Sequence, residues 1–308
     1  GLEPPKEFLR LIKEYKVGNI ILFRRNIQDG PQLKKLCATL RKVVEEETGV
    51  TPFITIDQEG GVVTRLPESE VNIPGAMAVA ATGNPRNAYD MGLLTAQELR
   101  SCGVDFNLAP VMDINCNPDN PVIGVRSYGD TPERVAEYGS QMVRGLLDGG
   151  VYCSLKHFPG HGDTAEDSHT ALAVTYKTLD ELQACELLPF AADTGLHAVM
   201  VGHIAAPNVT GDGTPATLSP QLVALIPDAE NTLIVTDSLA MDAITAAYTP
   251  GEAAVQALQA GCDVLLMPNS LPEAYAAVLE AVQNGTISEE RLDRSVNKIL
   301  LYKQQFAS

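Results

Sequence analysis

The chain has few basic side chains for its length. Its 308 residues include 22 lysines and arginines against 39 aspartates and glutamates, a formal net charge of −17. A surface this acidic repels phosphate backbones and anionic lipid headgroups. The chain also lacks any apolar run of the roughly 18 to 20 residues that a membrane-spanning helix needs. We therefore expect no nucleic-acid partner and no membrane span.

Closely spaced cysteines are also lacking. The six cysteines are scattered along the chain, and no two of them form a C-x-x-C pair. Structural zinc sites typically use such pairs, and disulfide frameworks are typical of short secreted chains dense in cysteine. No signal peptide is visible at the start of the chain. We expect buried free thiols in a reducing compartment, and hence a cytoplasmic protein.

A third absence concerns the fold. No glycine-rich dinucleotide fingerprint follows the first predicted strand, which disfavours a Rossmann fold. The chain instead alternates short apolar runs with helical patterns. Strands are predicted at 17–23, 53–57, 104–110, 151–155, 198–203, 232–237 and 262–268. This alternation predicts an α/β protein with a buried parallel sheet, either a closed barrel or an open doubly wound sheet.

Polar residues gather where the predicted strands end, and they favour the barrel. The residues at or just beyond these ends are Asp57, Asn107, Lys156, His157, His203 and Asp237. In a barrel the carboxyl ends of the strands converge on one mouth, where the chemistry takes place. We predict a (β/α)8 TIM-type barrel formed by residues 1–308 as a single catalytic domain. Only seven strands are found and the chain opens with a helix, so the first strand is expected to be missing from this chain.

The stretch KHFPGHGDTAEDSH at 156–169 is the densest group of reactive side chains. It holds three histidines and three acidic residues directly after the apolar run VYCSL. Asp167 could orient and charge His169, giving an imidazole that donates and accepts a proton near neutral pH. Both could equally be exposed loop residues. The loop also offers metal-ligand types, but without the helical spacing that sets metal geometry.

Three further side chains are candidates at the same mouth. Asp237 ends the strand in IVTDSLAMD and could serve as a nucleophile, a base, a metal ligand, a hydroxyl acceptor or a helix cap. Lys156 follows a buried strand in a place that loops enclose, which is unusual for a solvated lysine. We expect Lys156, and Arg126 in GVRSYGD, to bind hydroxyl or carboxylate groups of a ligand.

With these residues assembled, the chain resembles glycoside hydrolase family 3, and within it the β-N-acetylglucosaminidases. The matching stretches are GNIILFRRNI, IDQEGG, VDFNLAPVMDIN, GVRSYGD, KHFPGHGDTAEDSH and IVTDSLAMD, in order across nearly the whole chain. In this subgroup the loop supplies the acid/base as a His-Asp pair, whereas the β-glucosidases of the family take a glutamate from a second domain. Two departures stand out: Val62 replaces an arginine, and Ala173 stands where the loop commonly has a proline.

The resemblance implies a retaining hydrolase that releases terminal β-linked N-acetylglucosamine, from peptidoglycan fragments, without a cofactor or a metal. It implies Asp237 as nucleophile and His169 as general acid/base backed by Asp167. It further implies a set of sugar-binding residues, namely Asp57, Arg126, Lys156, His157 and His203. Three alternatives stay open: a phosphorylase, a metal-dependent hydrolase, and a sugar-binding barrel without activity. The sequence sets no oligomeric state.

Overall fold

The centre of the molecule is a curled parallel sheet. The structure is a computed structural model that describes residues 1–165, 172–192 and 197–306. The sheet has the strand order β1-β2-β3-β4-β6-β8, and the strands are β1 (Asn19–Leu22), β2 (Phe53–Ile56), β3 (Phe106–Asn107), β4 (Tyr152–Phe158), β6 (Ala198–Val201) and β8 (Leu233–Thr236). Each strand pairs in parallel with the next. A parallel bridge between Val235 and Val264 adds one more segment beyond β8.

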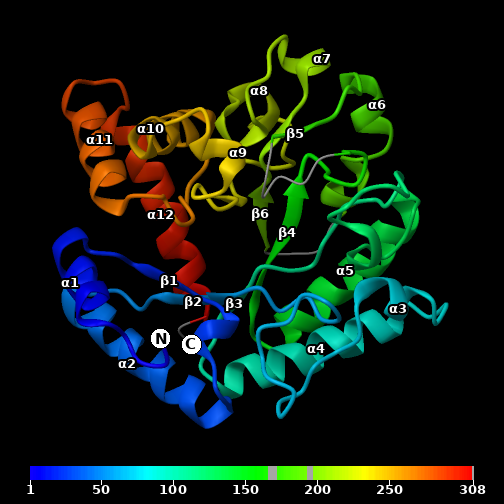
Figure 1. Cartoon of the computed structure of the whole chain (residues 1–308), viewed down its shortest axis with the longest axis horizontal. Helices are drawn as coiled ribbons and strands as arrows, with labels where there is room; N and C mark the ends of the chain where they lie inside the picture. The colour runs from blue at the N-terminus through cyan, green and yellow to red at the C-terminus, as the bar shows by residue number, and fades with distance from the viewer. Residues whose placement is uncertain (166–171, 193–196, 307–308) are drawn as a thin grey trace.

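Helices surround this sheet and connect its strands (Figure 1). They are α1 (Lys6–Tyr15), α2 (Gly30–Thr48), α3 (Ala76–Ala80), α4 (Arg86–Ser101), α5 (Pro132–Asp148), α6 (Leu179–Ala184), α7 (Pro207–Thr210), α8 (Pro220–Val223), α9 (Asp242–Thr245), α10 (Pro250–Ala260), α11 (Leu271–Gln283) and α12 (Glu289–Phe306). The 3-10 helices are η1 (Arg24–Asn26), η2 (Gly124–Arg126), η3 (Leu188–Ala191) and η4 (Ala216–Leu218). A small second sheet pairs β5 (Ala173–Val174) with β7 (Ile204–Ala205).

Local signals start and stop several helices. The Asp29 side chain accepts a hydrogen bond from the Gln32 amide and so caps α2. Thr249 and Glu252 form a capping box at the start of α10. Helices α4 and α5 pack closely because glycine stands at their contact: a Cβ on Gly145 would lie 2.1 Å from the Tyr89 carbonyl oxygen. These features could all be read from the sequence as helix boundaries or small residues.

Helix α12 holds the amino-terminal ends of strands from both edges of the sheet. The ammonium group of Lys298 donates to Asp263 over 2.8 Å, just before the bridge at Val264. The ammonium group of Lys303 donates to the Gly18 carbonyl over 3.0 Å, just before β1. The two edges are therefore tied together at the end opposite the strand termini that carry the polar residues.

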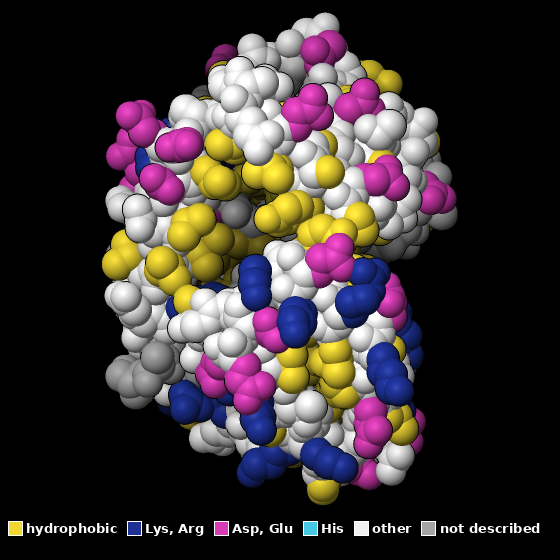
Figure 2. All heavy atoms as spheres, turned by 90° about the vertical axis from the view of Figure 1, so that its left-hand side faces the viewer, with side chains coloured by type: hydrophobic (Ala, Val, Ile, Leu, Met, Phe, Trp, Pro, Cys, Tyr) yellow, Lys and Arg dark blue, Asp and Glu magenta, His cyan; other side chains and the backbone are white. Residues whose placement is uncertain are grey.

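Between those two edges lies an apolar groove. It has a volume of about 690 Å³ and is bounded by α1, β1, α2, α11 and the segment 262–268. Hydrophobic side chains line the hollow on this side of the molecule (Figure 2). The predicted α/β architecture with a parallel sheet is confirmed, whereas within the described ranges the sheet curls without closing into a barrel.

Several predicted boundaries need correction. The predicted strand 104–110 forms regular ladder pairs at Phe106 and Asn107, and beyond them Ala109 and Pro110 contribute only carbonyl acceptors to β4, since Pro110 has no backbone N–H to donate. The predicted strand 262–268 is reduced to its bridge at Val264, because its other side faces the groove. Helix α6 ends at Ala184, and the 3-10 helix η3 follows it. Strand β4 runs on to Phe158, so Lys156 lies within the strand.

The predicted buried free thiols are found at four of the six cysteines. All six cysteines are free thiols, and four of them are buried, but Cys116 is exposed and Cys185 is partly exposed. Across residues 1–165, 172–192 and 197–306, each helix is too short or too polar to cross a bilayer.

Candidate active site

The polar residues at the strand ends meet in one cavity. This cavity has a volume of about 270 Å³ and lies at the carboxyl ends of β2, β4 and β8. Five of the predicted site residues line it, namely Asp57, Arg126, Lys156, His157 and Asp237. Met200, Met241 and Met267 contribute apolar wall. The cavity therefore combines charged groups with a hydrophobic lining.

Lys156 is the central cation of the cavity. Its side chain is only 3% exposed, and its ammonium group lies 2.9 Å from Asp57 Oδ1 and 2.7 Å from Glu59 Oε1. Burial alone would lower the pKa of this lysine, but the two carboxylates outweigh burial and raise the pKa above its usual value. Lys156 is thus held as a cation with fixed direction at the wall of the cavity.

A second ion pair shares Glu59. The Arg126 guanidinium donates to both Glu59 oxygens, from Nε over 2.8 Å and from Nη2 over 2.7 Å. Burial opposes the charge on Glu59, but Lys156 and Arg126 together lower its pKa to about 2. Because the guanidinium and carboxylate are planar, this bidentate pair fixes the orientation of both.

His157 is held from behind by a buried aspartate. His157 Nδ1 lies 2.7 Å from Asp113 Oδ2, and the His157 backbone N–H lies 3.1 Å from Asp113 Oδ1. The backbone N–H of His161 donates to the same Oδ1 over 2.7 Å. Asp113 is fully buried, and although burial opposes its charge, His157 lowers its pKa. The carboxylate therefore fixes both the ring of His157 and the start of the loop that follows β4.

Asp237 ends β8 with its side chain partly exposed to the cavity. The Ser238 backbone N–H donates to Asp237 Oδ1 over 2.7 Å. Burial opposes the negative charge, but His203, His157 and the Ser238 amide together lower the pKa of Asp237. Its carboxylate is therefore ionised at neutral pH.

His203 lies behind the cavity rather than in its lining. The side chain is fully buried, with Nδ1 2.8 Å from Thr217 Oγ1 and Nε2 2.8 Å from the Ser238 carbonyl oxygen. Those contacts fix the backbone next to Asp237. Both ring nitrogens face protein atoms, and the sugar-binding role that the resemblance implies for His203 stays a prediction.

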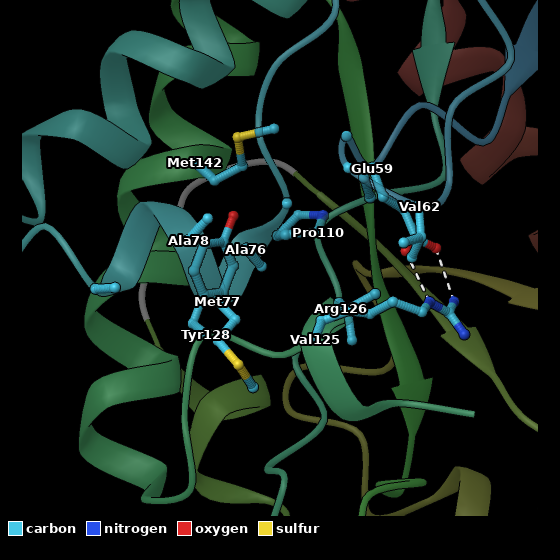
Figure 3. Close-up of a pocket in the computed structure, with 16 residues that line it drawn as sticks. Glu59, Val62, Ala76, Met77, Ala78, Pro110, Val125, Arg126, Tyr128 and Met142 are labelled. Carbon is cyan, nitrogen blue, oxygen red and sulfur yellow. Dashed lines mark hydrogen bonds and ion pairs between the residues drawn. The ribbon is translucent and has the colours of Figure 1, made fainter. Parts of the chain in front are cut away.

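A second cavity lies on the other side of the Glu59–Arg126 pair (Figure 3). It has a volume of about 420 Å³ and is lined mainly by small and apolar side chains, among them Ala76, Pro110 and Met142. Val62, where the family has an arginine, lines this cavity and is 73% exposed. The ion pair is therefore a wall between a charged hollow and an apolar one.

Two predicted residues fall outside the described part of the chain. Asp167 and His169 belong to the range 166–171, so their placement against Asp237 is a prediction from the sequence alone. Within the described ranges, no group of three or more histidine, cysteine, aspartate or glutamate side chains is arranged to hold a metal ion.

Nearly the whole chain matches one protein family. The model of the glycosyl hydrolase family 3 N-terminal domain matches residues 2–301. The chain belongs to glycoside hydrolase family 3. The resemblance predicted from the sequence motifs is thereby confirmed at the level of the family.

Individual relatives of this family 3 chain point to one subgroup. It is 34% identical to beta-hexosaminidase A of Pseudoalteromonas piscicida over 97% of this chain and 55% of that protein. It is 33% identical to a beta-hexosaminidase of Pseudomonas aeruginosa, over 94% of this chain and 86% of that protein.

Among solved structures, a glycoside hydrolase family 3 beta-N-acetylglucosaminidase from Paenibacillus sp. matches with a TM-score of 0.96 and 46% identity. The match covers all of this chain and 60% of that one. The chain thus spans little more than half the length of the first of these curated relatives and of this structure.

The family 3 cavity also contains charged residues that the sequence reasoning did not single out. Glu59, Arg65 and Asp113 hold or line the groups just described. Glu59 stands two residues after Asp57 in IDQEGG, and Asp113 follows the predicted strand 104–110. The position of Glu59 and Asp113 shortly after a strand end could therefore have marked them as site residues. Arg65 follows a loop with no such pattern.

Proposed function

We propose that this family 3 chain is the catalytic domain of a retaining β-N-acetylglucosaminidase, with residues 1–308 acting as one domain. The single observation that carries the proposal is the ionised Asp237 carboxylate facing a cavity ringed by Asp57, Lys156, His157 and Arg126. A carboxylate at such a position can attack an anomeric carbon. The beta-hexosaminidases and the beta-N-acetylglucosaminidase among the relatives support the choice of sugar.

In the proposed first step the Asp237 carboxylate displaces the leaving oxygen from the anomeric carbon and forms a covalent glycosyl-enzyme. A lowered pKa suits this role, since only the ionised carboxylate has the electron pair to attack. The Ser238 backbone N–H holds this carboxylate in one direction, and His203 contacts the Ser238 carbonyl oxygen. The sequence resemblance assigns the proton for the leaving oxygen to His169, backed by Asp167.

In the second step water replaces the leaving group, and His169 takes its proton as it attacks the glycosyl-enzyme. The two displacements at one carbon give net retention of the β configuration. Free N-acetylglucosamine leaves and Asp237 is restored as a carboxylate. No described residue other than Asp237 has to form a covalent bond.

Binding of the sugar hydroxyls falls to the charged wall. We propose that Asp57 accepts a hydrogen bond from a sugar hydroxyl and that Lys156 donates one. The Lys156 ammonium group and Asp57 Oδ1 are paired at 2.9 Å. Charge-assisted hydrogen bonds of this kind are stronger than neutral ones and are directional. Glu59 keeps Lys156 and Arg126 aimed at the cavity. We propose His157, fixed by Asp113, as a further donor to the sugar.

Phosphorolysis is the second candidate, and one observation favours it. Arg65 lines the cavity, and its Nη2 lies 3.6 Å from Asp57 Oδ2. Its Nε is buried and has no hydrogen-bond partner within the described part of the chain. An unsatisfied guanidinium nitrogen suits an oxyanion such as phosphate. A histidine acid/base, neutral after it gives up its proton, would also repel phosphate less than a carboxylate would.

Two finer points belong to the same proposal. We propose that the curled sheet is part of a (β/α)8 barrel, because both of its edges run parallel and face one apolar groove. We propose peptidoglycan fragments as the natural source of the sugar, on the resemblance alone. Release of N-acetylglucosamine from purified muropeptides, compared with chitooligosaccharides, tests that source.

The function is tested with aryl β-N-acetylglucosaminide and aryl β-glucoside in buffers with and without phosphate. We expect turnover of the N-acetylglucosaminide only, with β-configured free sugar as first product by proton NMR. N-acetylglucosamine 1-phosphate in the phosphate buffer would mean phosphorolysis. An inverted product, or equal turnover of the glucoside, would contradict the retaining N-acetylglucosaminidase.

A further inference from the structure

A cluster of charged residues flanks the segment that contains the predicted acid/base pair, and none of the site residues described above belongs to it. Lys177 is ion-paired with Glu186, and its ammonium group also lies 3.7 Å from Asp163 Oδ1. Thr175 Oγ1 donates to the other Asp163 oxygen over 3.2 Å. The Cys116 thiol lies 3.8 Å from Glu186 Oε1.

The residues of this cluster stand on both sides of one segment of the chain. Asp163 stands at the beginning of the segment 164–174, and Thr175 and Lys177 follow its end. Both sides of the segment are therefore joined to each other through side chains. The segment contains Asp167 and His169, the predicted acid/base pair.

The surroundings of the cluster are fixed independently. On one side Asn120 Nδ2 donates to the carbonyl oxygens of His161 and Thr164, over 2.8 Å each. On the other, β5 pairs with β7, and the Thr175 amide donates to the Ala205 carbonyl over 2.9 Å. Lys177 is the cation that connects these two anchored sides.

Burial and charge make this connection stronger than a surface ion pair. The Glu186 side chain is only 2% exposed, and its Oε2 has no hydrogen-bond partner among the residues that the structure describes. Burial works against the charge on Lys177, but Glu186 and Asp163 raise the pKa of Lys177 above its usual value. A carboxylate so buried needs a cation, so Lys177 is held there with little freedom.

We infer that Lys177 is a positioning residue for the general acid of the proposed reaction. By bridging Asp163 and Glu186 it sets the distance between the two ends of segment 164–174. Fixing the ends of a loop removes conformations that the loop would otherwise visit. The inference rests on the proposed function, because it is the acid/base role of His169 that makes this segment matter for catalysis.

The test distinguishes a loss of proton donation from a loss of activity that affects every substrate equally. Lys177→Met is compared with Lys177→Arg on two N-acetylglucosaminides, one with a methyl leaving group and one with dinitrophenyl. Methoxide needs a proton as it leaves, whereas dinitrophenoxide does not. We expect Lys177→Met to lower kcat/KM on the order of 100-fold for the methyl glycoside and by less than about 5-fold for the dinitrophenyl one. Lys177→Arg should restore most of the loss.

Two further variants keep the outcome interpretable. Lys177→Met/Glu186→Gln removes the buried unpaired charge and should fold as the wild type does while keeping the same selective defect. Lys42→Met is the matched control, since that lysine is 75% exposed and lies 3.8 Å from Glu46 on the same helix. Lys42→Met should leave kcat/KM unchanged for both glycosides. Equal losses on the two glycosides in the double variant would overturn the inference.

A readout without activity separates this inference from the proposed function. Amide hydrogen exchange over peptides containing 164–174 should be faster in Lys177→Met/Glu186→Gln than in the wild type, and unchanged elsewhere. Unchanged exchange there would overturn the inference whatever the enzyme does. A wild type that hydrolyses neither glycoside, with faster exchange in the variant, would overturn the proposed function and leave the fixing of the segment's ends supported.

Discussion

The two cavities on either side of the Glu59–Arg126 ion pair differ in almost every respect. The cavity of about 270 Å³ at the strand ends presents Asp57, Lys156 and Asp237, and it is where we propose that the sugar binds. The cavity of about 420 Å³ behind the pair is larger but is walled mainly by alanine, glycine, valine and methionine.

The difference shows what a charged site needs from its surroundings. In the smaller cavity Lys156 pairs with Asp57 and Glu59, Arg126 pairs with Glu59, and Asp237 accepts a hydrogen bond from a backbone N–H. The apolar cavity contributes no such partner and keeps the ion pair in a low-dielectric setting, where its attraction is stronger than in water. Volume is therefore a poor guide to the functional side, and the arrangement of charge is a better one.

The largest effect is expected on the charged side. Asp237→Asn removes the proposed nucleophile while keeping shape and hydrogen bonding, so kcat should fall by at least about 1000-fold. Asp242→Asn, five residues further on and exposed, should keep full activity. Initial rates on an aryl β-N-acetylglucosaminide measure both. Activity retained in Asp237→Asn would remove this cavity from consideration as the catalytic centre.

The next effect concerns the wall itself. Glu59→Gln leaves Lys156 and Arg126 short of a buried anion, so the free energy of unfolding should drop by about 3 to 5 kcal/mol. Glu68→Gln changes an exposed glutamate in the same loop and should have almost no effect. Urea unfolding followed by circular dichroism gives the two midpoints. Similar midpoints would show that the wall does not depend on this carboxylate.

A smaller effect should appear as acid lability. The pKa of Glu59 is about 2 in the folded protein, below its ordinary value of 4.5, so its ionised form stabilises the fold above pH 4.5. That contribution should fade as the pH falls from 4.5 toward 2. Urea midpoints at several pH values should converge for the wild type and Glu59→Gln over this window. Asp113 and Asp237, whose pKa values are also lowered, should leave part of the acid lability in the variant.

The smallest effect is expected on the apolar side. Ala76→Leu adds apolar volume to the larger cavity, and activity should stay within about 3-fold of the wild type. Ala76→Asp instead adds a carboxylate to the same apolar lining without a new cation, and should cost about 1 to 3 kcal/mol of stability. Thermal unfolding of the two variants compares them. An equal loss in both would mean that space, rather than charge, distinguishes this cavity.

The sequence predicted the parts of the site that are local. Asp57, Lys156 and Asp237 could be chosen because each follows or ends an apolar run, and parallel strands bring such ends together. The predicted acid/base pair, Asp167 and His169, rests on the motif alone, because it lies outside the described residues.

Other features could not be predicted because their partners are distant in the chain. Nothing near Glu59 shows that Arg126, 67 residues later, will bind it in a bidentate manner. The carboxylate of Asp113 meets His157 across 44 residues, and only the packed sheet brings them together. The predicted strand 262–268 also failed for a non-local reason, since one of its sides faces a groove instead of a strand.

The sequence by itself determined the alternation of strands and helices, the family, and which charged residues stand at the strand ends. It could do so because hydrophobic period, caps and motifs are properties of neighbouring residues. The tertiary structure alone decided which carboxylate pairs with which cation, and that His203 supports Asp237 from behind. It also decided that the charged hollow and the apolar one share a wall. Those choices depend on distances between segments far apart in the chain, which only the packed fold sets.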